Sequence, residues 1–331
     1  MTTPNNEIDL MEWQVGNQTA FDTAVAPTVK LLGIAEGKLS PLVETSEVEE
    51  QRGTLIPAFN VTLDKIAGAA NLSGDVSFEQ IAWVLDSLLG TATPGATPEF
   101  QRDYAGPTTT KPTSRMLTLV NGSSEGVYGL IGGIVNEASL KVETNKRATF
   151  SSSLLGRNVA TDTLATLTDP SVINFAHANQ MTLFLDTWAG TMGATPITAT
   201  AFSFELGLNA NKALKHGLGT EYPKDVSQKK LAADGNQLKL ALEFEATQSK
   251  AWLDAMIGSA PFKAQIRLKF TLSATKSLQI DYCGWQKEAP ELFSDSDGIA
   301  QVEMTLSPLY HATVANWLKI ALVNGIADIT V

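Results

Sequence analysis

The residues that most often do chemistry in proteins are few in this chain, and they lie far apart in its sequence. The three histidines are His177, His216 and His311. None of them has a second histidine or a paired carboxylate at the spacing that a metal site requires. We therefore expect no metal site, and we interpret these histidines as ordinary surface or loop residues.

Cys283 is the only cysteine, which excludes an intramolecular disulfide and any metal site built from several thiolates. It falls within an alternating pattern typical of a strand, where a thiol usually packs and does not react. The sequence also contains no G-x-S-x-G motif and no phosphate-binding loop. It offers no candidate for nucleophilic catalysis, and one cysteine fits a reducing compartment.

Two pairs of neighbouring acids remain as candidates for catalysis, because β-sandwiches can place such carboxylates for glycoside hydrolysis. The pairs are Glu243 with Glu245, and Asp295 with Asp297. Acids at alternate positions of a strand share one face of a sheet, and that face is usually solvated. We expect these acids to be solvated, and we expect no catalytic residue. An enzyme, most plausibly a glycosidase, is the third alternative for function.

Cofactor and nucleic-acid motifs are also missing. Gly217-Leu218-Gly219 is a fragment of a dinucleotide-binding motif, but Tyr222 stands where the third glycine belongs. Lys229-Lys230 is only a pair, without interleaved aromatic residues. The net charge of −11 argues against wrapping of nucleic acid, because neutralised phosphates supply most of that affinity. We expect no cofactor.

The composition is typical of a chain that folds. At 331 residues, with 44% apolar and 18% charged residues, it is long enough for two ordinary domains with a core each. No apolar run approaches the roughly 20 residues that span a bilayer. The first residues are polar and acidic, whereas a signal peptide would begin basic and then become apolar. We expect a soluble protein.

A weak internal repeat is the most informative pattern. The segments 82–90 and 251–258 run in step from Leu85 and Leu253 onward, at an offset of 168 residues. Each segment reads as a short amphipathic helix ended by glycine. Trp83 and Trp252 are expected to anchor a core. The repeat therefore predicts two similar domains.

The first of these helices has a well-defined beginning. Ser77 can cap it, with Gln80 at the third helical position, and Val76 and Ile81 flank the cap as a hydrophobic staple. Around both helices, apolar residues recur at every second position, which predicts half-buried strands. We expect strands near 238–244, 262–272, 278–282, 302–306 and 318–322, and in the first copy near 59–63, 117–119 and 140–142.

Short connections with turn dipeptides favour antiparallel pairing of these strands. Residues 91–113, rich in Pro, Gly and Thr, are expected to form a long loop that grips a neighbouring subunit, since only the first copy contains it. The best boundary between domains lies at 158–175, around Asp169-Pro170. We therefore expect one domain over residues 1–170, which contains the loop, and a second over residues 171–331.

At this point the chain resembles a known family. Arg52–Leu55, the stretch Gly74–Ile81 and the helix that ends at Gly90 look like the tail tube proteins of long-tailed, siphovirus-like bacteriophages. The turn Asp297-Gly298 and the ending Leu318–Gly325 resemble the second domain of two-domain members. The likeness extends from about residue 25 to the end of the chain.

The resemblance implies a fold and an assembly. The fold would be mainly β, with two tandem β-sandwich or half-open barrel domains, each with one flanking α-helix. Subunits of this family join their sheets edge to edge into a β-lined ring around a lumen. Six single-domain subunits make such a ring, so three two-domain chains would do the same.

In that case the protein is a structural component of the virion tail, assembled in the host cytoplasm, and not an enzyme. Its partners would be other copies of itself in stacked homotrimeric rings, and tail proteins such as the tape measure and the terminator. Genome DNA would pass through the lumen without specific binding, helped by acidic residues on the wall. The alternative is a surface or capsid-decorating β-sandwich that binds a glycan or a protein partner.

Overall fold

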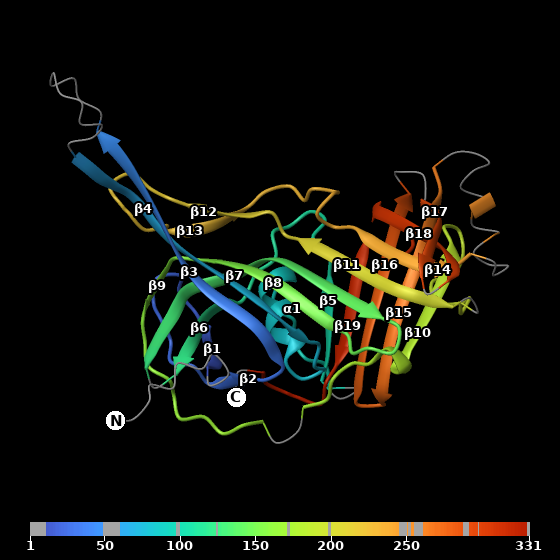
Figure 1. Cartoon of the computed structure of the whole chain (residues 1–331), viewed down its shortest axis with the longest axis horizontal. Coiled ribbons are helices and arrows are strands. Elements are labelled where there is room, and N and C mark those ends of the chain that lie inside the picture. The colour runs from blue at the N-terminus through green and yellow to red at the C-terminus, as the bar shows by residue number, and fades with distance from the viewer. Residues whose placement is uncertain are drawn as a thin grey trace.

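The structure is a computed structural model that describes residues 11–48, 60–96, 100–123, 125–170, 173–197, 200–244, 250, 253–254, 261–286, 291–296 and 298–329. The described residues form a mainly β protein in which open sheets pack in layers (Figure 1). The mainly β fold expected from the sequence is confirmed. No helix among the described residues is long and apolar enough to cross a membrane.

One sheet runs the length of the molecule, and we call it the long sheet. Neighbouring strands in it are antiparallel throughout. In spatial order its strands are β3 (Ile34–Val48), β4 (Asn60–Asp75), β8 (Thr149–Gly156), β7 (Gly126–Glu143), β11 (Ala201–Asn209), β14 (Leu238–Glu243), β18 (Ile299–Pro308) and β17 (Glu291–Ser296). The pairing of β7 with β11 joins the two halves of the chain.

Further strands pack behind the long sheet in two groups. The first group has the order β2 (Val29–Leu31), β1 (Glu12–Gln18), β6 (Met116–Ser123), then the beginning of β7, and β9 (Asn158–Thr161). The second group has the order β10 (Met181–Thr187), β15 (Lys263–Ser273), β16 (Lys276–Gln286), β19 (Leu318–Val323) and β5 (Gln101–Ala105). Each half of the molecule is therefore a sandwich of β-sheets.

Strand β7 belongs to both layers of the first sandwich. Its register with β6 is interrupted around Gly132, which has a φ of 68°. A Cβ atom at this position would lie 2.5 Å from the carbonyl oxygen of Phe21, so only glycine fits here without a shift of the backbone. The irregularity lets one strand leave the rear layer and enter the long sheet.

The predicted period of two is confirmed in the strands of the second half. In β14, Leu238, Leu240 and Leu242 are buried while Lys239 is exposed. The alternation continues over most of β18 and β19 and the middle of β15, whereas five successive residues of β16, 280–284, are buried. Buried side chains from both layers merge into one main core because each strand presents one apolar face.

Helix α1 (Ile81–Leu89) lies within this core and is buried on nearly every side (Figure 1). The Ser77 hydroxyl accepts a hydrogen bond from the Gln80 N–H at 3.0 Å, as the capping pattern predicts. The Gln80 side chain does not return to the cap, however. It accepts a hydrogen bond from the N–H of Leu32 and donates one to the carbonyl of Lys30, so it ties the helix to β2.

The observed end of α1 and the burial of Trp83 also match the predictions from the sequence. Trp83 is buried, and Gly90 ends the helix with a φ of 112°. Most of the second expected helix, including Trp252, lies outside the described residues, although Leu253 and Asp254 are helical. Asp297 of the expected turn also lies outside them, while Gly298 has the positive φ of a turn.

Residues 91–113 are not the external loop that the sequence suggests. They contain β5, which pairs antiparallel with β19 over residues 101–105 and 319–323 of the same chain. Arg102 is only 2% exposed, and its guanidinium donates a 2.8 Å hydrogen bond to the Asn324 side chain. The segment therefore contacts the other half of its own chain. The sequence did not predict β5 because the partner strand is remote in sequence, and a contact with a neighbouring subunit stays a prediction.

Strand β5 also fixes α1 through a buried cluster around Asp86, which is 0% exposed. The Tyr104 hydroxyl donates a hydrogen bond of 2.7 Å to one carboxylate oxygen of Asp86. The Arg115 guanidinium donates bonds of 2.9 and 2.8 Å to the other oxygen. A buried charge with this many partners contributes to a unique arrangement of α1, β5 and β6.

We expect Asp86→Asn to lower the free energy of unfolding by about 3 kcal/mol, because it leaves the Arg115 charge without its partner. Urea unfolding followed by circular dichroism measures this loss. Asp225→Asn is the matched control, since Asp225 forms an exposed ion pair with Lys215 at 3.6 Å. The control should change the free energy by less than about 0.5 kcal/mol. Equal losses in the two variants would contradict a structural role for the cluster.

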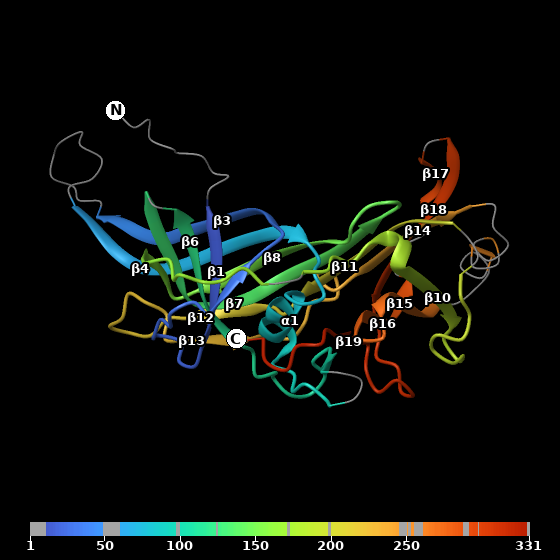
Figure 2. The ribbon, with the colours of Figure 1, turned by 90° about the horizontal axis from the view of Figure 1, so that it is seen from below.

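A hairpin of β12 (Lys212–Lys215) and β13 (Asp225–Gln228) leaves the second half and lies along the first, as both views show (Figures 1 and 2). Val226 of this arm packs in a small core with Phe21 and Ile134. The Ile66 N–H donates a hydrogen bond of 2.9 Å to the carbonyl of Glu221 near the end of the arm. The arm therefore holds the two halves together, and Lys111, which follows β5, donates a hydrogen bond of 2.9 Å to the carbonyl of Val226.

Lys212 begins this arm with a buried amino group. Its Nζ donates hydrogen bonds to the carbonyls of Ser87 and Leu88 at the end of α1, at 2.6 and 3.2 Å. Further bonds reach the Ser114 hydroxyl and the Val135 carbonyl at 2.9 and 3.0 Å. A positive charge is favourable at a helix C-terminus. Even so, burial lowers the pKa of Lys212 from 10.5 to about 7, helped by Lys111.

This pKa predicts a pH-dependent stability. Between about pH 7 and pH 10.5 the unfolded chain binds more protons at Lys212 than the folded chain does, so stability rises with pH in this window. We therefore compare the free energies of unfolding of the wild type and of Lys212→Met. The difference, wild type minus variant, should increase between pH 7 and pH 10.5 by up to about 1.4 kcal/mol per pH unit. Urea titrations at several pH values measure it, and a constant difference would contradict the prediction.

Candidate functional site

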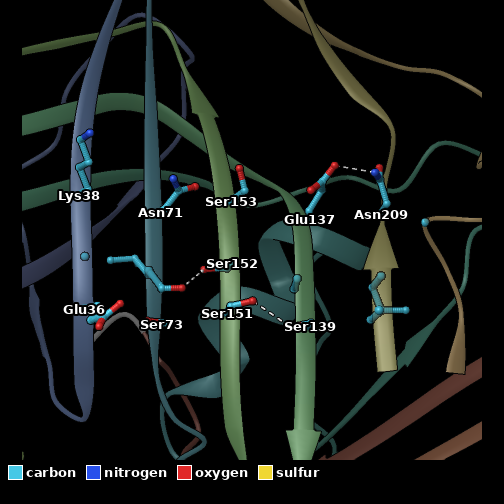
Figure 3. Close-up of a pocket in the computed structure, with 16 residues that line it drawn as sticks. Glu36, Lys38, Asn71, Ser73, Glu137, Ser139, Ser151, Ser152, Ser153 and Asn209 are labelled. Carbon is cyan, nitrogen blue, oxygen red and sulfur yellow. Dashed lines mark hydrogen bonds between the residues drawn. The ribbon is translucent and has the colours of Figure 1, made fainter. Parts of the chain in front are cut away.

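A groove of about 710 Å³ lies on the outer face of the long sheet (Figure 3). It crosses β3, β4, β8, β7 and β11. Its side chains point away from the core because they occupy the alternate positions to the buried ones. Most are small and polar. They include Glu36, Lys38, Asn71, Ser73, Glu137, Ser139, Ser151, Ser153 and Asn209.

The strand registers place these side chains in rows across the groove. One row runs from Lys38 through Asn71, Ser153 and Glu137 to Asn209. The Asn209 side chain donates a hydrogen bond of 2.7 Å to the Glu137 carboxylate. Serine and asparagine give this row short, polar side chains.

A second row consists mainly of hydroxyl groups. Ser73 lies opposite Ser151, and Ser151 lies opposite Ser139, with 2.8 Å between the last two hydroxyl oxygens. The ionisable side chains that line the groove are Glu36, Lys38 and Glu137, and Glu36 lies opposite Ser73 in the register. None of the described hydrogen bonds joins one of these three side chains to a hydroxyl of the row, so the row shows no nucleophile bonded to a base. Sequence analysis missed this surface, because alternation identifies two faces of a strand without saying which one lines a groove.

The same face continues over the second half and carries more acids than bases. Lys141 lies opposite Glu205, which lies opposite Lys239, so these charges alternate. Among the described residues of this face, the acids include Glu36, Glu44, Asp75, Glu137, Glu143, Glu205, Glu243 and Glu303, and the lysines include Lys38, Lys65, Lys141 and Lys239. The face is mainly polar, with an acidic excess, although Leu42 is exposed on it.

Glu143 shows how the charges on this face are held in place. Lys141 and Lys146 contact its carboxylate at 2.6 and 2.5 Å. Their hydrogen bonds lower the pKa of Glu143 to about 2, and the bond to Glu143 raises the pKa of Lys141. This acid stays ionised at any pH near neutrality. All three side chains are substantially exposed, so the pairs contribute little stability.

The histidines occupy separate places. His177 caps the short 3-10 helix η2 (Ala178–Gln180), where its Nδ1 accepts a hydrogen bond from the Asn179 N–H. His216 lies in the connection of the β12–β13 arm. His311 lies in the connection between β18 and β19, where it is buried: its Nε2 is 2.8 Å from the Trp188 carbonyl, and the two rings pack edge to face. The described residues hold no cluster of potential metal ligands.

The other candidates for chemistry are also dispersed. Cys283 is buried in β16, as the strand pattern predicts, and burial raises the pKa of its thiol to about 12. Glu243 ends β14, but its expected partner Glu245 lies outside the described residues. Asp297 lies outside them too, and for Asp295 only the backbone in β17 is described. Gly217 and Gly219 lie in the connection of the arm, with no helix after them.

The long sheet has two free edges in the described part of the chain. Strand β3 pairs only with β4, and strand β17 pairs only with β18. A free edge presents unpaired N–H and C=O groups that can pair with another chain. Because the eight strands alternate in direction, β3 and β17 run in opposite directions. The two edges are therefore compatible with antiparallel pairing to each other in a second copy.

Comparison with known proteins adds one finding. The family described as phage tail tube protein matches residues 14–307, which include the long sheet except for the last residue of β18. A search of curated proteins gave no match.

Proposed function

This chain belongs to the phage tail tube family, and we propose that three copies close into a ring whose lumen is lined by the outer face of the long sheet. Family membership gives the chain a structural role in the virion tail, through assembly with itself and with other tail proteins. The match favours this role over a capsid-decorating protein and over an enzyme. What we propose beyond family membership is the number of copies in a ring and the surface that lines its lumen.

The strand order supports a duplicated domain. The first half contributes β3-β4-β8-β7 and the second contributes β11-β14-β18-β17, each in the same antiparallel pattern. Helix α1 follows the second strand of the first set. The helical residues Leu253 and Asp254 likewise follow β14, the second strand of its own set. We place the two domains at residues 1–170 and 171–331, with the boundary between β9 and β10.

The duplication also suggests how a ring closes. Within one chain, the last strand of the first set, β7, pairs with the first strand of the second set, β11. The corresponding strands at the free edges are β17 and β3. Pairing β17 of one copy with β3 of the next repeats the junction that the chain already makes within itself. Three chains then close a continuous antiparallel barrel, and closure satisfies both free edges.

Within such a ring, the outer face of the long sheet lines the lumen, since its other face is buried against α1 and the rear strands. The lumen wall is then small, polar and acidic in excess. DNA carries one negative charge per roughly 1.7 Å of duplex axis, so this wall repels it at short range. The wall provides a conduit along which genome DNA slides without specific binding.

The remaining partners follow from the same assembly. Rings stack into a tube in the host cytoplasm. The tube ends offer surfaces for a terminator protein, and the lumen offers space for a tape measure protein before DNA enters. These assignments rest on the family match and on the hollow ring.

Electron microscopy of the purified protein at high concentration, together with native mass spectrometry, tests this proposal. We expect hollow tubes in the images and a species of three chains in the mass spectrum. A ring of six chains would contradict the trimer. A monomer that forms neither rings nor tubes under any condition would contradict the proposed function.

A further inference from the structure

The short sequence Leu-Val-Asn-Gly occurs twice in this chain, at residues 119–122 and 322–325. An asparagine followed by glycine can react with its own backbone, because glycine has no side chain that hinders the approach of its nitrogen to the asparagine side chain. The two copies are locally identical, so a difference in their reactivity has to come from the fold. The structure gives them different surroundings.

The first copy is held in the interior of a sheet. Asn121 and Gly122 belong to β6, which pairs with β1 on one side and with the beginning of β7 on the other. Asn121 lies opposite Trp13 in β1 and opposite Tyr128 in β7. Pairing on both sides fixes this backbone in the extended conformation. The nitrogen of Gly122 therefore cannot turn onto the Asn121 side chain unless the sheet opens.

The second copy leaves its strand at the asparagine. Asn324 follows β19 and is only 1% exposed, whereas Gly325 is exposed and has a φ of 70°. This positive φ turns the chain away from the sheet directly after the reactive pair. None of the described hydrogen bonds uses the N–H of Gly325. Its nitrogen is therefore not fixed by a sheet, and water reaches this side of the pair.

The side-chain carbonyl of Asn324 is polarised by two donors. Its Oδ1 accepts a hydrogen bond of 2.8 Å from the Arg102 guanidinium and one of 3.2 Å from the Ile326 N–H. Both partners can only donate, so the oxygen and not the amide nitrogen faces them. The amide Nδ2 is buried and has no hydrogen-bond partner in the described part of the chain. The two donors resemble an oxyanion hole, because they stabilise the negative charge that develops on Oδ1 when a nucleophile attacks Cγ.

We propose that Asn324 deamidates within the folded chain, through attack of the Gly325 backbone nitrogen on its side-chain Cγ. A bond forms between this nitrogen and Cγ, the bond from Cγ to Nδ2 breaks, and Nδ2 leaves as ammonia with the proton of the Gly325 amide. The product is a five-membered succinimide. Water then breaks the new bond: its hydroxyl adds to Cγ, and its other proton returns to the Gly325 nitrogen. The chain stays intact, and the asparagine has become an aspartate.

Arg102 also determines which carbonyl of the succinimide reacts with water. Attack at the main-chain carbonyl gives isoaspartate, in which the chain runs through the side chain, whereas attack at Cγ gives aspartate. The guanidinium polarises the Cγ carbonyl, because it bonds the oxygen of that group. We therefore expect aspartate as the main product.

The product carboxylate lies beside a buried cation. Arg102 is 2% exposed, and its other described hydrogen bonds go to the carbonyls of Phe100 and Ala327. Burial lowers the pKa of Arg102, because desolvation outweighs the attraction of nearby acids. A carboxylate at position 324 offsets this desolvation with a charge-assisted pair. Deamidation therefore strengthens the contact between β5 and the end of β19.

Peptide mass mapping of the purified protein, sampled over several weeks at neutral pH, measures conversion at both asparagines in one sample. We expect Asn324 to convert at least about tenfold faster than Asn121, since oxyanion donors typically accelerate acyl chemistry by more than that. Fragmentation that separates aspartate from isoaspartate should identify aspartate at position 324. Equal rates, or a product that is mainly isoaspartate, would overturn the proposal. In urea the two identical sequences should react at similar rates, and a ratio that survives unfolding would overturn it as well.

Variants test the role of Arg102. Arg102→Gln should slow conversion of Asn324 at least about tenfold, and Arg102→Lys should restore part of the rate. The matched control is Arg115→Gln, which removes a buried guanidinium bonded to Asp86 and should leave the rate unchanged. An unchanged rate in folded Arg102→Gln would overturn the proposal.

Asn324→Asp tests the consequence without loss of Arg102, because it carries the product from the start. It should unfold at a higher urea concentration than freshly prepared wild type, and aged wild type should approach it. An equal or lower midpoint would overturn the strengthening of the contact. None of these measurements needs a ring, so their failure would leave the proposed function as it stands.

Discussion

Replacing Glu137, Glu205 and Glu303 by lysine together is expected to turn a lumen that lets DNA pass into one that binds it strongly. All three lie on the outer face of the long sheet and are at least partly exposed. Each replacement changes the local charge by two units, and three chains repeat the change around one ring. Lysines that contact six or more phosphates give an affinity that falls by a factor of about 10³ or more between 50 and 200 mM salt.

Fluorescence anisotropy of a labelled short duplex, measured over that salt range with assembled protein, gives this affinity directly. The control replaces Asp103, Glu125 and Glu221 by lysine, which produces the same net charge at exposed positions away from the outer face of the long sheet. The control should bind DNA far more weakly. Equal binding by the two variants, or no binding by correctly assembled rings of the first, would contradict the assignment of the lumen wall.

Removal of β5 is expected to have the largest effect on folding. Replacing residues 92–112 by a short linker takes away the edge partner of β19, the hydrogen bond to Asn324 and the contact of Tyr104 with Asp86. Each buried polar group left without a partner costs about 1–3 kcal/mol, and a charged group costs more. Because a protein is typically stable by only about 5–15 kcal/mol, we expect no cooperatively folded chain at 25 °C.

Circular dichroism and urea unfolding measure this result. Asp103→Ala changes an exposed side chain of the same strand and should alter the free energy of unfolding by less than about 0.5 kcal/mol. A shortened chain that unfolds cooperatively at the same urea concentration as the wild type, and fails only in assembly, would show instead that the segment serves contacts between subunits.

Much of the fold could be predicted because its signals are local. Large apolar residues recur at every second position over most of β14, β15, β18 and β19 and over the first part of β16. The start of α1 is also local, since Ser77 and Gln80 are three residues apart and bond as predicted. The family resemblance, which rested on short segments spread over the chain, is confirmed by a match over residues 14–307.

What could not be predicted depends on contacts between distant residues. Strand β5 has only five residues, QRDYA, and its core positions are the polar-tipped Arg102 and Tyr104. Nothing nearby in the sequence shows that Arg102 bonds Asn324, which is 222 residues away. The residues that line the groove could not be predicted for a related reason. Ser139, Ser151 and Glu137 become neighbours only when β7 and β8 pair.

We propose that the outer face of the long sheet lines a lumen closed by three chains. Electron cryomicroscopy of the assembled tube at a resolution that separates strands tests it most directly. The account predicts a continuous antiparallel barrel in which β17 of each chain pairs with β3 of the next and the row from Lys38 to Asn209 faces the lumen. A tube whose wall is formed by other strands, or whose rings join through edges other than β3 and β17, would contradict it.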